Sequence, residues 1–347
     1  MSAYFHINGL EMRFGSFQLG PVSLELEEKD YLVLLGATGC GKTSLLRCIV
    51  GSTGKIKNSI FFGGKDIGIL PLRKRRIGHV SQTVDLFPHL SARKNIAFGL
   101  AYQGLTAAER QKRTDRYLEL FDLVKQADQP VVTLSGGENK RTAMARSLIV
   151  QPEILLLDEP LGMLDQNGRK AMLHILKMIH DELQTATIHV THDRHEAWRI
   201  AKKCAVMDRG RIMQTGTVAE LVRKPDTRFV AEFLGGTNIF EAAFEGIHAR
   251  LGWTDLTLSK PVGYAKGWVL IRPELIHIIP GNRDGKIFGI VSAIHDFGEY
   301  AEVAVILQPS SMELKAHVSP ADMHQLVVGK QIFLNWRDED IHPFGEG

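Results

Sequence analysis

The first two thirds of the chain contain short, unbroken apolar runs that end in turn-forming or acidic residues. Five of them stand out, at 30–36, 76–82, 153–160, 185–192 and 203–210. Runs of this length without alternating polar residues are typical of strands buried on both faces of a parallel sheet. With predicted helices between them, such as 107–126 and 168–183, they indicate an open α/β sheet. Such sheets bind their ligands at the carboxyl ends of the strands.

After about residue 237 the pattern changes to short β-rich segments separated by turns. They lie at 267–279, 286–298, 300–307, 312–319 and 330–337. This pattern predicts a small antiparallel barrel or sandwich. Gly235–Gly236 is the natural joint, so we expect two domains, 1–235 and 236–347.

Composition narrows the class of protein. A net charge of +3 over 347 residues is too small to indicate nucleic-acid binding, and the basic run Arg73–Arg76 is interpreted as a solvated turn. No apolar run approaches the roughly 18 residues that span a bilayer, and the N-terminus lacks the features of a signal peptide. Three cysteines form no disulfide framework. We expect a soluble, cytoplasmic protein that could still dock on a membrane.

The stretch GATGCGKTS follows the first apolar run and matches G-x-x-x-x-G-K-[ST]. Its glycines let the backbone wrap a phosphate, Lys42 can reach the β- and γ-phosphates, and Thr43 can bind Mg²⁺. The expected nucleotide contacts in this loop are Gly36, Ala37, Thr38, Gly39, Cys40, Gly41, Lys42, Thr43 and Ser44. The glycine spacing is not G-x-G-x-x-G, which argues against a dinucleotide-binding enzyme.

Polar side chains follow other predicted strands. Asp158 can hold Mg²⁺, and Glu159 beside it can polarise the attacking water. The Gln82 amide can meet the metal or the water, and His192 can contact the γ-phosphate.

Zinc is the alternative for the histidines around His192. His189 and His192 are separated by an odd step on a strand, so their side chains should face opposite sides. No cysteine pair or H-E-x-x-H helix lies nearby, which argues against zinc.

A second glycine-rich helix start, Ser135-Gly136-Gly137, lies within LSGGENKRTAMARSL. Helix N-termini collect backbone N–H groups and bind anions. One ATP needs one phosphate loop, so this helix start should serve another nucleotide. The economical arrangement is a head-to-tail dimer, in which Ser135–Gly137 of each chain caps the γ-phosphate held by Lys42 of the other.

Together these motifs resemble the nucleotide-binding subunits of ATP-binding-cassette (ABC) transporters over about the first 235 residues. GATGCGKT resembles their Walker A motif, ILLLDE Walker B, LSGGE the signature motif and LGMLD (161–165) the D-loop. The resemblance implies an α/β phosphate-loop NTPase cassette with a helical subdomain. It makes Gln82 the Q-loop glutamine, His192 the switch histidine and Asp165 a nucleotide-site residue. Phe14 resembles the aromatic residue that stacks on adenine, and Phe17 is a rival.

Two positions depart from the family pattern. Glu138 stands where glutamine is usual, and its carboxylate would repel a γ-phosphate unless helix amides, Lys140 and Arg141 offset the charge or the side chain points away. Gly162–Met163 stands where Ser-Ala is commoner. Neither change removes a catalytic group, so ATP hydrolysis is expected.

The C-terminal region, about 237–347, resembles the transport-associated OB-type barrel of many bacterial import ATPases. The resemblance implies a homodimer that uses ATP and Mg²⁺ under two membrane subunits, at the cytoplasmic face of the membrane, with an extracytoplasmic binding protein. It favours ferric iron, polyamines or oxyanions over sugars as the solute. The segment 85–100 resembles the part that docks the membrane subunit, or is an ordinary helix start capped by Ser91.

Two other functions compete with an importer ATPase. A soluble ABC ATPase acting on DNA or ribosomes should have a coiled-coil insertion, tandem cassettes or a strongly basic face, and the sequence has none of these. A regulatory subunit that binds ATP without hydrolysing it is disfavoured because Lys42, Asp158, Glu159 and His192 are all present.

Overall fold

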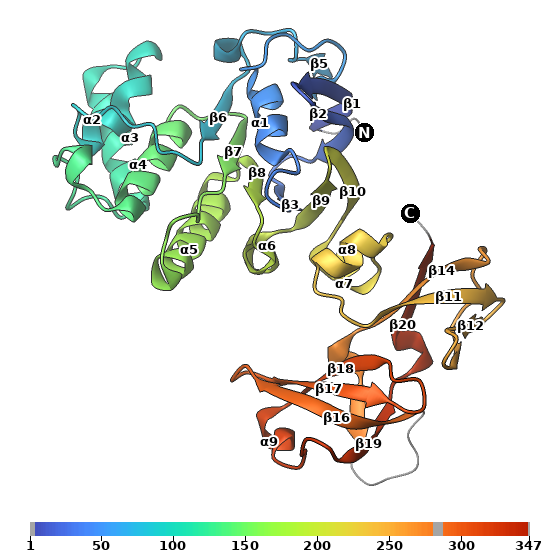
Figure 1. Ribbon diagram of the computed structural model, residues 1–347. Helices are drawn as coiled ribbons and strands as arrows, with labels where there is room; N and C mark the ends of the chain where they lie inside the picture. The colour runs from blue at the N-terminus through green and yellow to red at the C-terminus, as the bar shows by residue number, and fades with distance from the viewer. Residues whose placement is uncertain (1–3, 280–286, 346–347) are drawn as a thin grey trace. The chain divides into compact units, whose positions relative to one another are not determined.

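The computed structural model describes residues 4–279 and 287–345 of the chain. The chain divides into two compact units, Met1–Val218 and Ala219–Gly347 (Figure 1). Each unit has its own sheets and its own hydrophobic core.

The first unit is built on a six-stranded sheet in the order β10-β9-β3-β8-β7-β6. Its strands are β3 (Tyr31–Gly36), β6 (Ile77–Val80), β7 (Ile154–Asp158), β8 (Ala186–Thr191), β9 (Lys203–Asp208) and β10 (Arg211–Gly216). The first five are parallel and confirm the five predicted strands, whereas β10 is an antiparallel edge. Every residue of β3, β7 and β8 is buried, as unbroken apolar runs require.

Helices connect these strands. They are α1 (Lys42–Val50), α2 (Ala92–Ala97), α3 (Ala107–Leu120), α4 (Gly136–Leu148), α5 (Gln166–Leu183) and α6 (Arg194–Ile200). Ser91 caps α2 by accepting a hydrogen bond from the Lys94 N–H, as its residue type predicts. The helix predicted over 107–126 ends at Leu120. Helices α2, α3 and α4 pack together as a helical group (Figure 1).

A second sheet of this unit was not predicted. It is antiparallel, in the order β2-β1-β4-β5, and consists of β1 (Phe5–Phe14), β2 (Phe17–Leu26), β4 (Ile60–Phe62) and β5 (Lys65–Asp66). Its long strands, β1 and β2, mix buried and exposed side chains, so their sequences contain no unbroken apolar run.

The interpretation of Arg73–Arg76 as a solvated turn is wrong for one residue. Arg75 is buried, and its pKa is lowered by burial. Its guanidinium donates to four main-chain carbonyl oxygens at 2.7–3.0 Å, those of Cys48, Ile49, Gly68 and Leu70. Helix ends leave carbonyl groups without intrahelical partners, and Arg75 supplies donors to the C-terminal end of α1.

The second unit is an all-β domain preceded by two short helices, α7 (Val218–Arg223) and α8 (Arg228–Phe233). Its two five-stranded sheets, β13-β12-β11-β14-β20 and β15-β19-β16-β17-β18, contain antiparallel pairs throughout the described residues. The strands are β11 (Ile239–Glu245), β12 (His248–Arg250), β13 (Asp255–Thr257), β14 (Lys266–Ile271), β15 (His277–Ile279), β16 (Ile287–Asp296), β17 (Ala301–Leu307), β18 (Glu313–Val318), β19 (Gln331–Asn335) and β20 (Ile341–Gly345). One helix, α9 (Pro320–Met323), precedes β19, and Lys286 of the run predicted at 286–298 lies outside the described residues. The predicted all-β character is confirmed.

Helices α7 and α8 precede the predicted joint at Gly235–Gly236, yet they belong to the second compact unit. One reason is apolar packing, because Ala231 of α8 shares a small cluster with Leu270 and Phe344. The other is a buried arginine on the barrel side, Arg272.

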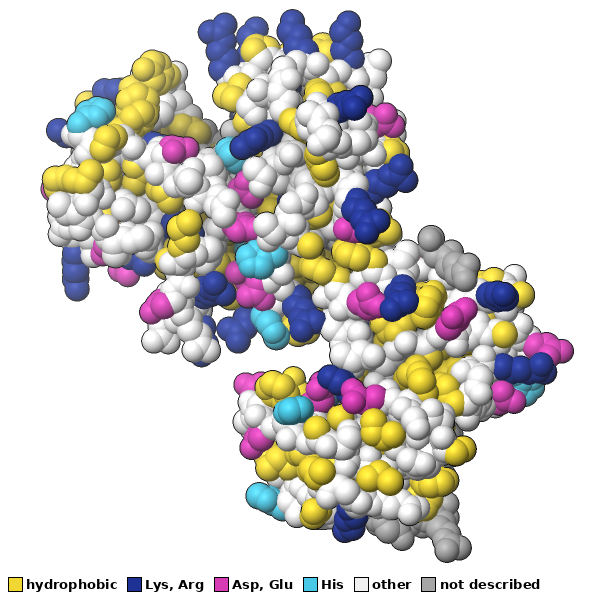
Figure 2. Space-filling view, in the orientation of Figure 1, with side chains coloured by type: hydrophobic (Ala, Val, Ile, Leu, Met, Phe, Trp, Pro, Cys, Tyr) yellow, Lys and Arg dark blue, Asp and Glu magenta, His cyan; other side chains and the backbone are white. Residues whose placement is uncertain are grey.

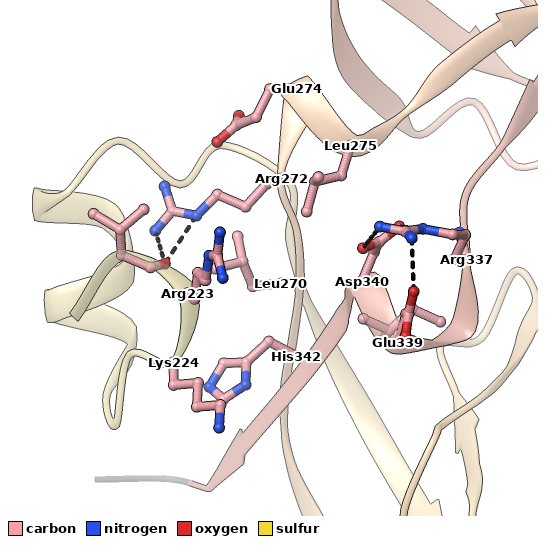
Figure 3. Close-up of a pocket in the computed structure, with 12 residues that line it drawn as sticks. Arg223, Lys224, Leu270, Arg272, Glu274, Leu275, Arg337, Glu339, Asp340 and His342 are labelled. Carbon is pink, nitrogen blue, oxygen red and sulfur yellow. Dashed lines mark hydrogen bonds and ion pairs between the residues drawn. The ribbon is translucent and has the colours of Figure 1, made fainter. Parts of the chain in front are cut away.

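Arg272 lies at the wall of a pocket of about 510 Å³ that is lined by α7 and by the ends of β14 and β20 (Figure 3). The guanidinium donates from Nε to the carbonyl oxygen of Val222 at 3.0 Å and from Nη1 to that of Leu234 at 3.3 Å. Elsewhere on the wall Arg337 pairs with Glu339 at 2.7 Å. Arg272, which follows β14, therefore tethers both short helices to the all-β domain.

We expect Arg272→Ala to destabilise the second unit by about 3 kcal/mol, because it leaves buried carbonyl oxygens without charge-assisted donors. Thermal unfolding can be followed by tryptophan fluorescence, since Trp253, Trp268 and Trp336 lie in the second unit and Trp198 in the first. Arg250→Ala is the control, because that side chain is 62% exposed and pairs with the exposed Glu245, so its loss should matter little. Equal shifts in the two variants would contradict the tether.

Candidate nucleotide site

The predicted phosphate loop connects β3 to α1, and its glycines are required by the backbone. Gly39 and Gly41 have φ angles of 83° and 112°, a left-handed conformation that favours glycine. A Cβ atom at Gly36 would collide with the carbonyl oxygen of Met207. Gly41 is the residue before α1, so the free N–H groups of the helix start lie at this loop.

Lys42 is the first residue of α1 and is buried. Its ammonium group donates to the carbonyl oxygens of Gly36 and Ala37 at 2.7 and 2.9 Å. The Lys42 Nζ atom therefore lies directly over the loop that would wrap the phosphates. A cation and a helix start converge there, as a polyphosphate requires.

Thr43 and Asp158 are brought together by α1 and β7. The Thr43 hydroxyl donates to Asp158 Oδ1 at 3.2 Å. Asp158 is buried, and its burial raises the carboxyl pKa, while the bond from Thr43 acts in the opposite direction. Hydroxyl and carboxylate oxygens are ligands that Mg²⁺ prefers, so this pair fits a magnesium site beside the phosphate loop.

Glu159 contacts the other two predicted catalytic residues, Gln82 and His192. Its Oε2 accepts from Nε2 of Gln82 at 3.2 Å, and its Oε1 lies 3.1 Å from Nδ1 of His192. Gln82 follows β6 and His192 follows β8, the two strands on either side of β7. Of the three predicted metal residues, Thr43 and Asp158 thus contact each other, while the Gln82 amide bonds to Glu159.

The two histidines of the zinc alternative lie in different surroundings, but only His189 is on the strand, because β8 ends at Thr191. His189 is fully buried, and its Nδ1 lies 3.0 Å from the Tyr31 hydroxyl. His192 lies beyond the end of β8 with an exposed side chain beside Glu159.

The signature segment begins α4 with a capping box. The Ser135 hydroxyl accepts from the Glu138 N–H at 3.3 Å, and Glu138 Oε2 accepts from the Ser135 N–H at 2.7 Å. Gln126 Nε2 donates to the other oxygen, Oε1, at 2.8 Å. Hydrogen bonds from Ser135, and secondarily from Gln126, lower the pKa of the Glu138 carboxyl. The spacing S-x-x-E is a known signal of this cap, so the bond could have been found in the sequence.

The remaining predicted residues lie at the edges of the site. Phe14 and Phe17 face each other across the turn between β1 and β2. Phe17 packs against the phosphate loop, because a Cβ atom at Gly41 would lie 2.7 Å from its ring. Asp165 caps α5 by accepting from the Gly168 N–H at 2.8 Å.

Lys140 has a contact that the sequence does not indicate. Besides being a possible counter-charge for Glu138, its ammonium group is buried and donates to the carbonyl oxygen of Gly162 in the segment 161–165. Periodicity along α4 does not show which loop a long side chain reaches, so this contact had no sequence signal.

A phosphate loop, an acidic pair and a capped glycine-rich helix on this fold define an ATP-binding cassette. A family model described as ABC transporter matches residues 19–162, and a model of the TOBE domain matches 269–344. The spermidine/putrescine import ATP-binding protein PotA of Bacillus thuringiensis subsp. konkukian is 33% identical over 98% of this chain and 98% of its own. The chain therefore belongs to the ATP-binding subunits of ABC importers, a family of ATP-hydrolysing proteins.

Other relatives share parts of the chain. The sulfate/thiosulfate import ATP-binding protein CysA 1 of Shewanella oneidensis is 42% identical over 69% of this chain and 65% of its own length. The structure of cbiO1 from Clostridium perfringens, part of the ABC transporter complex cbiONQ, aligns with a TM-score of 0.58 at 27% identity, covering 64% of this chain and 91% of that one. In the described residues, no helix is both long enough and apolar enough to cross a membrane.

We expect Glu138→Gln to preserve or raise the ATPase rate, because an amide oxygen can still accept from the Ser135 N–H while the negative charge is removed. Glu138→Ala should instead destabilise the start of α4 by about 1 kcal/mol, since it removes the carboxylate half of the capping box and leaves only the Ser135 hydroxyl. Steady-state ATPase assays and thermal unfolding of both variants measure this. A collapse of activity in Glu138→Gln alone would mean that the charge itself is needed.

The pH dependence of stability supplies a second check on Glu138. The folded-state pKa of this carboxyl is lowered, so its stabilising effect is present above the pKa of the unfolded chain and is lost as the pH falls through the folded value. The stability difference between the parent and Glu138→Ala should therefore shrink in acid.

Proposed function

We propose that this importer subunit hydrolyses ATP at two sites shared between two copies of the chain, and that dimer closure drives solute uptake through membrane subunits. The arrangement of Glu159 between Gln82 and His192, next to Asp158 and the phosphate loop, carries this proposal. Four neighbouring strands, β3, β8, β7 and β6, bring these groups to one edge of the sheet.

The roles follow from the contacts. Lys42 and the loop amides would hold the β- and γ-phosphates, and Thr43 with Asp158 would hold Mg²⁺, which neutralises phosphate charge when bound. Glu159 would orient the attacking water and take its proton. His192 and Gln82 hold the Glu159 carboxylate from two sides, so they would fix its direction and meet the γ-phosphate and the water.

The second copy would complete each site. The residues Ser135, Gly136 and Gly137 begin α4, where N–H groups lack intrahelical partners, and Ser135 and Gly136 are exposed. Glu138 Oε2 accepts from the Ser135 N–H, and the Ser135 hydroxyl accepts from the Glu138 N–H, so the amides of Gly136 and Gly137 would serve the partner's phosphate. The ATP-binding cassette MJ0796, whose solved structure is titled dimeric and bound to ADP and Pi, shares the fold with a TM-score of 0.53 over 62% of this chain and 98% of that one.

The solute belongs to the class of polyamines or small oxyanions in this proposal. The relative that matches over 98% of both chains is named for spermidine and putrescine, and the one that is 42% identical is named for sulfate and thiosulfate. Uptake of labelled spermidine and of labelled sulfate by cells that carry or lack the chain would decide between the two, and an effect on neither would contradict the class.

A surface on the helical group fits the membrane subunits. Phe98 is 43% exposed and Tyr102 83% exposed, and the Phe98 ring lies 4.4 Å from that of Phe87. Figure 2 shows hydrophobic side chains gathered on this part of the first unit. These aromatic residues lie in or just after the segment 85–100, which resembles the docking segment of the family.

Glu159→Gln should still bind Mg-ATP but lose hydrolysis by about 100-fold or more, because an amide cannot take the proton of the attacking water. Light scattering of this variant should show an ATP-dependent dimer. Lys42→Ala should lose ATP binding and the dimer together. Full turnover in Glu159→Gln would exclude its assigned role, and ATP binding without a change in mass would contradict the shared sites.

Phe98→Asp should weaken binding to inverted membrane vesicles that contain the membrane subunits by about tenfold, because a charge would be buried where an aromatic ring docks. The ATPase rate of the isolated chain should not change. Val327→Asp, at a 60% exposed position of the barrel, is the control. Unchanged vesicle binding in Phe98→Asp would place the docking surface elsewhere.

A further inference from the structure

The D-loop, 161–165, is held by two cations that the proposed chemistry does not use. The ammonium group of Lys140, on α4, donates to the carbonyl oxygen of Gly162. Nε of Arg169, on α5, donates to the carbonyl oxygen of Leu164 at 3.1 Å. The two bonds grip the loop on either side of a single residue, Met163.

Met163, between the two bonded carbonyl groups, has a strained backbone conformation. Its φ angle is 64°, in the left-handed region, and its side chain is 89% exposed. For a residue other than glycine, this conformation costs about 1 kcal/mol or more of free energy. No burial of the Met163 side chain offsets that cost, so the bonds to the neighbouring carbonyl groups must help to hold it.

The loop also lies against Glu159. The Gly162 N–H donates to the Glu159 carbonyl oxygen at 3.0 Å. A Cβ atom at Gly162 would lie 3.3 Å from that oxygen and 3.8 Å from Oε2 of the carboxylate. A shift of Gly162 therefore moves the residue that is assigned to orient water.

The ammonium group of Lys140 is influenced by charges on both sides of the D-loop. Burial lowers its pKa, the charges of Glu196 and Glu159 act in the opposite direction, and the charge of Arg169 acts in the same direction as burial. Glu196 is a buried residue of α6, the helix that follows His192. Lys140 thus lies among groups from α4, the D-loop, α6 and the end of β7.

A purely structural role explains this placement less well. An isolated ammonium group is costly to bury, and an apolar side chain of similar length often packs as well or better. In this chain the buried ammonium group bonds to the D-loop, and the charge of Glu159 acts on it. Its own helix, α4, begins with the residues that would cap the ATP of the other copy.

We propose that Lys140 and Arg169 form a clamp on the D-loop that positions Glu159 and couples it to the start of α4. This inference rests on the proposed function in one respect, that α4 contacts the nucleotide of the second copy. Lys140 and Arg169 are positioning residues, because they act through Gly162 and Leu164 and need not touch ATP.

The clamp can be tested on the full chain with Lys140→Gln, Lys140→Arg and Arg169→Gln. Lys170→Gln, an exposed neutralisation one residue from Arg169, is the matched control. In the nucleotide-free protein, hydrogen exchange at the amides of 162–164 should become about tenfold faster in the two glutamine variants and not in the control. This readout needs neither ATP nor a dimer.

The kinetic readout separates positioning from packing. In both glutamine variants kcat should fall about tenfold or more while KM stays within about threefold, because the groups that bind phosphate are untouched. Lys140→Arg should recover at least half of the parent kcat, since it keeps a cation. If Lys140→Gln does not fold, Arg169→Gln decides, because its side chain is 45% exposed and its loss should not prevent folding.

Unchanged exchange and unchanged kcat in a folded glutamine variant would overturn the clamp. A Lys140→Arg variant as impaired as Lys140→Gln would also overturn it, because shape and not charge would then matter. A failure of the shared-site proposal looks different: Glu159→Gln alone would bind ATP without forming a dimer, while the exchange effect of the clamp would persist.

Discussion

One main-chain hydrogen bond, from the Glu159 N–H to the carbonyl oxygen of Val190 at 3.0 Å, fixes the geometry on which the site depends. It joins the ends of β7 and β8 at the point where Glu159 adopts a φ angle of 47°. Asp158 is the last residue of β7 and points to Thr43 at the start of α1. The left-handed turn sends the next carboxylate the other way, toward groups that follow β6 and β8. Two adjacent carboxylates therefore point to two different sets of groups, Asp158 to Thr43 and Glu159 to Gln82 and His192.

The residues at this edge of the sheet could be predicted from the sequence, because each strand and the phosphate loop are marked by a short local pattern. Unbroken apolar runs identified five parallel strands, and parallel strands end at one edge, so residues that follow them meet there. The phosphate loop was equally readable, since the left-handed angles at Gly39 and Gly41 require the residue type that the motif contains. The half-exposed strands β1 and β2 lacked such a signal, and the extent of α3 beyond Leu120 was overestimated.

What the sequence could not give are contacts of long side chains with main-chain atoms far along the chain. Arg75 sits in a basic run that reads as a solvated turn, yet it pairs with carbonyl groups of α1. Its partner is a backbone group, which every residue carries and no motif marks. Glu138 is a different case, because its bond to the Ser135 N–H lies three residues away and the S-x-x-E spacing does mark it as a helix cap.

Arg75, Arg272 and Lys140 are all buried cations that donate to main-chain carbonyl oxygens. They differ in the number of bonds they make and therefore in how easily the cation can move. The two arginines spread several donors over carbonyl groups of helix ends, which fixes those elements rigidly. Lys140 donates to a loop carbonyl, and the charges that act on its ammonium group are those of Glu196, Glu159 and Arg169. A point charge with one loop contact can shift as the balance of nearby charges changes, whereas a multiply bonded guanidinium cannot do so without breaking several bonds. In the proposed clamp, the bond from Lys140 to the Gly162 carbonyl oxygen is therefore the contact through which a change of charge near Glu159 would act on the D-loop.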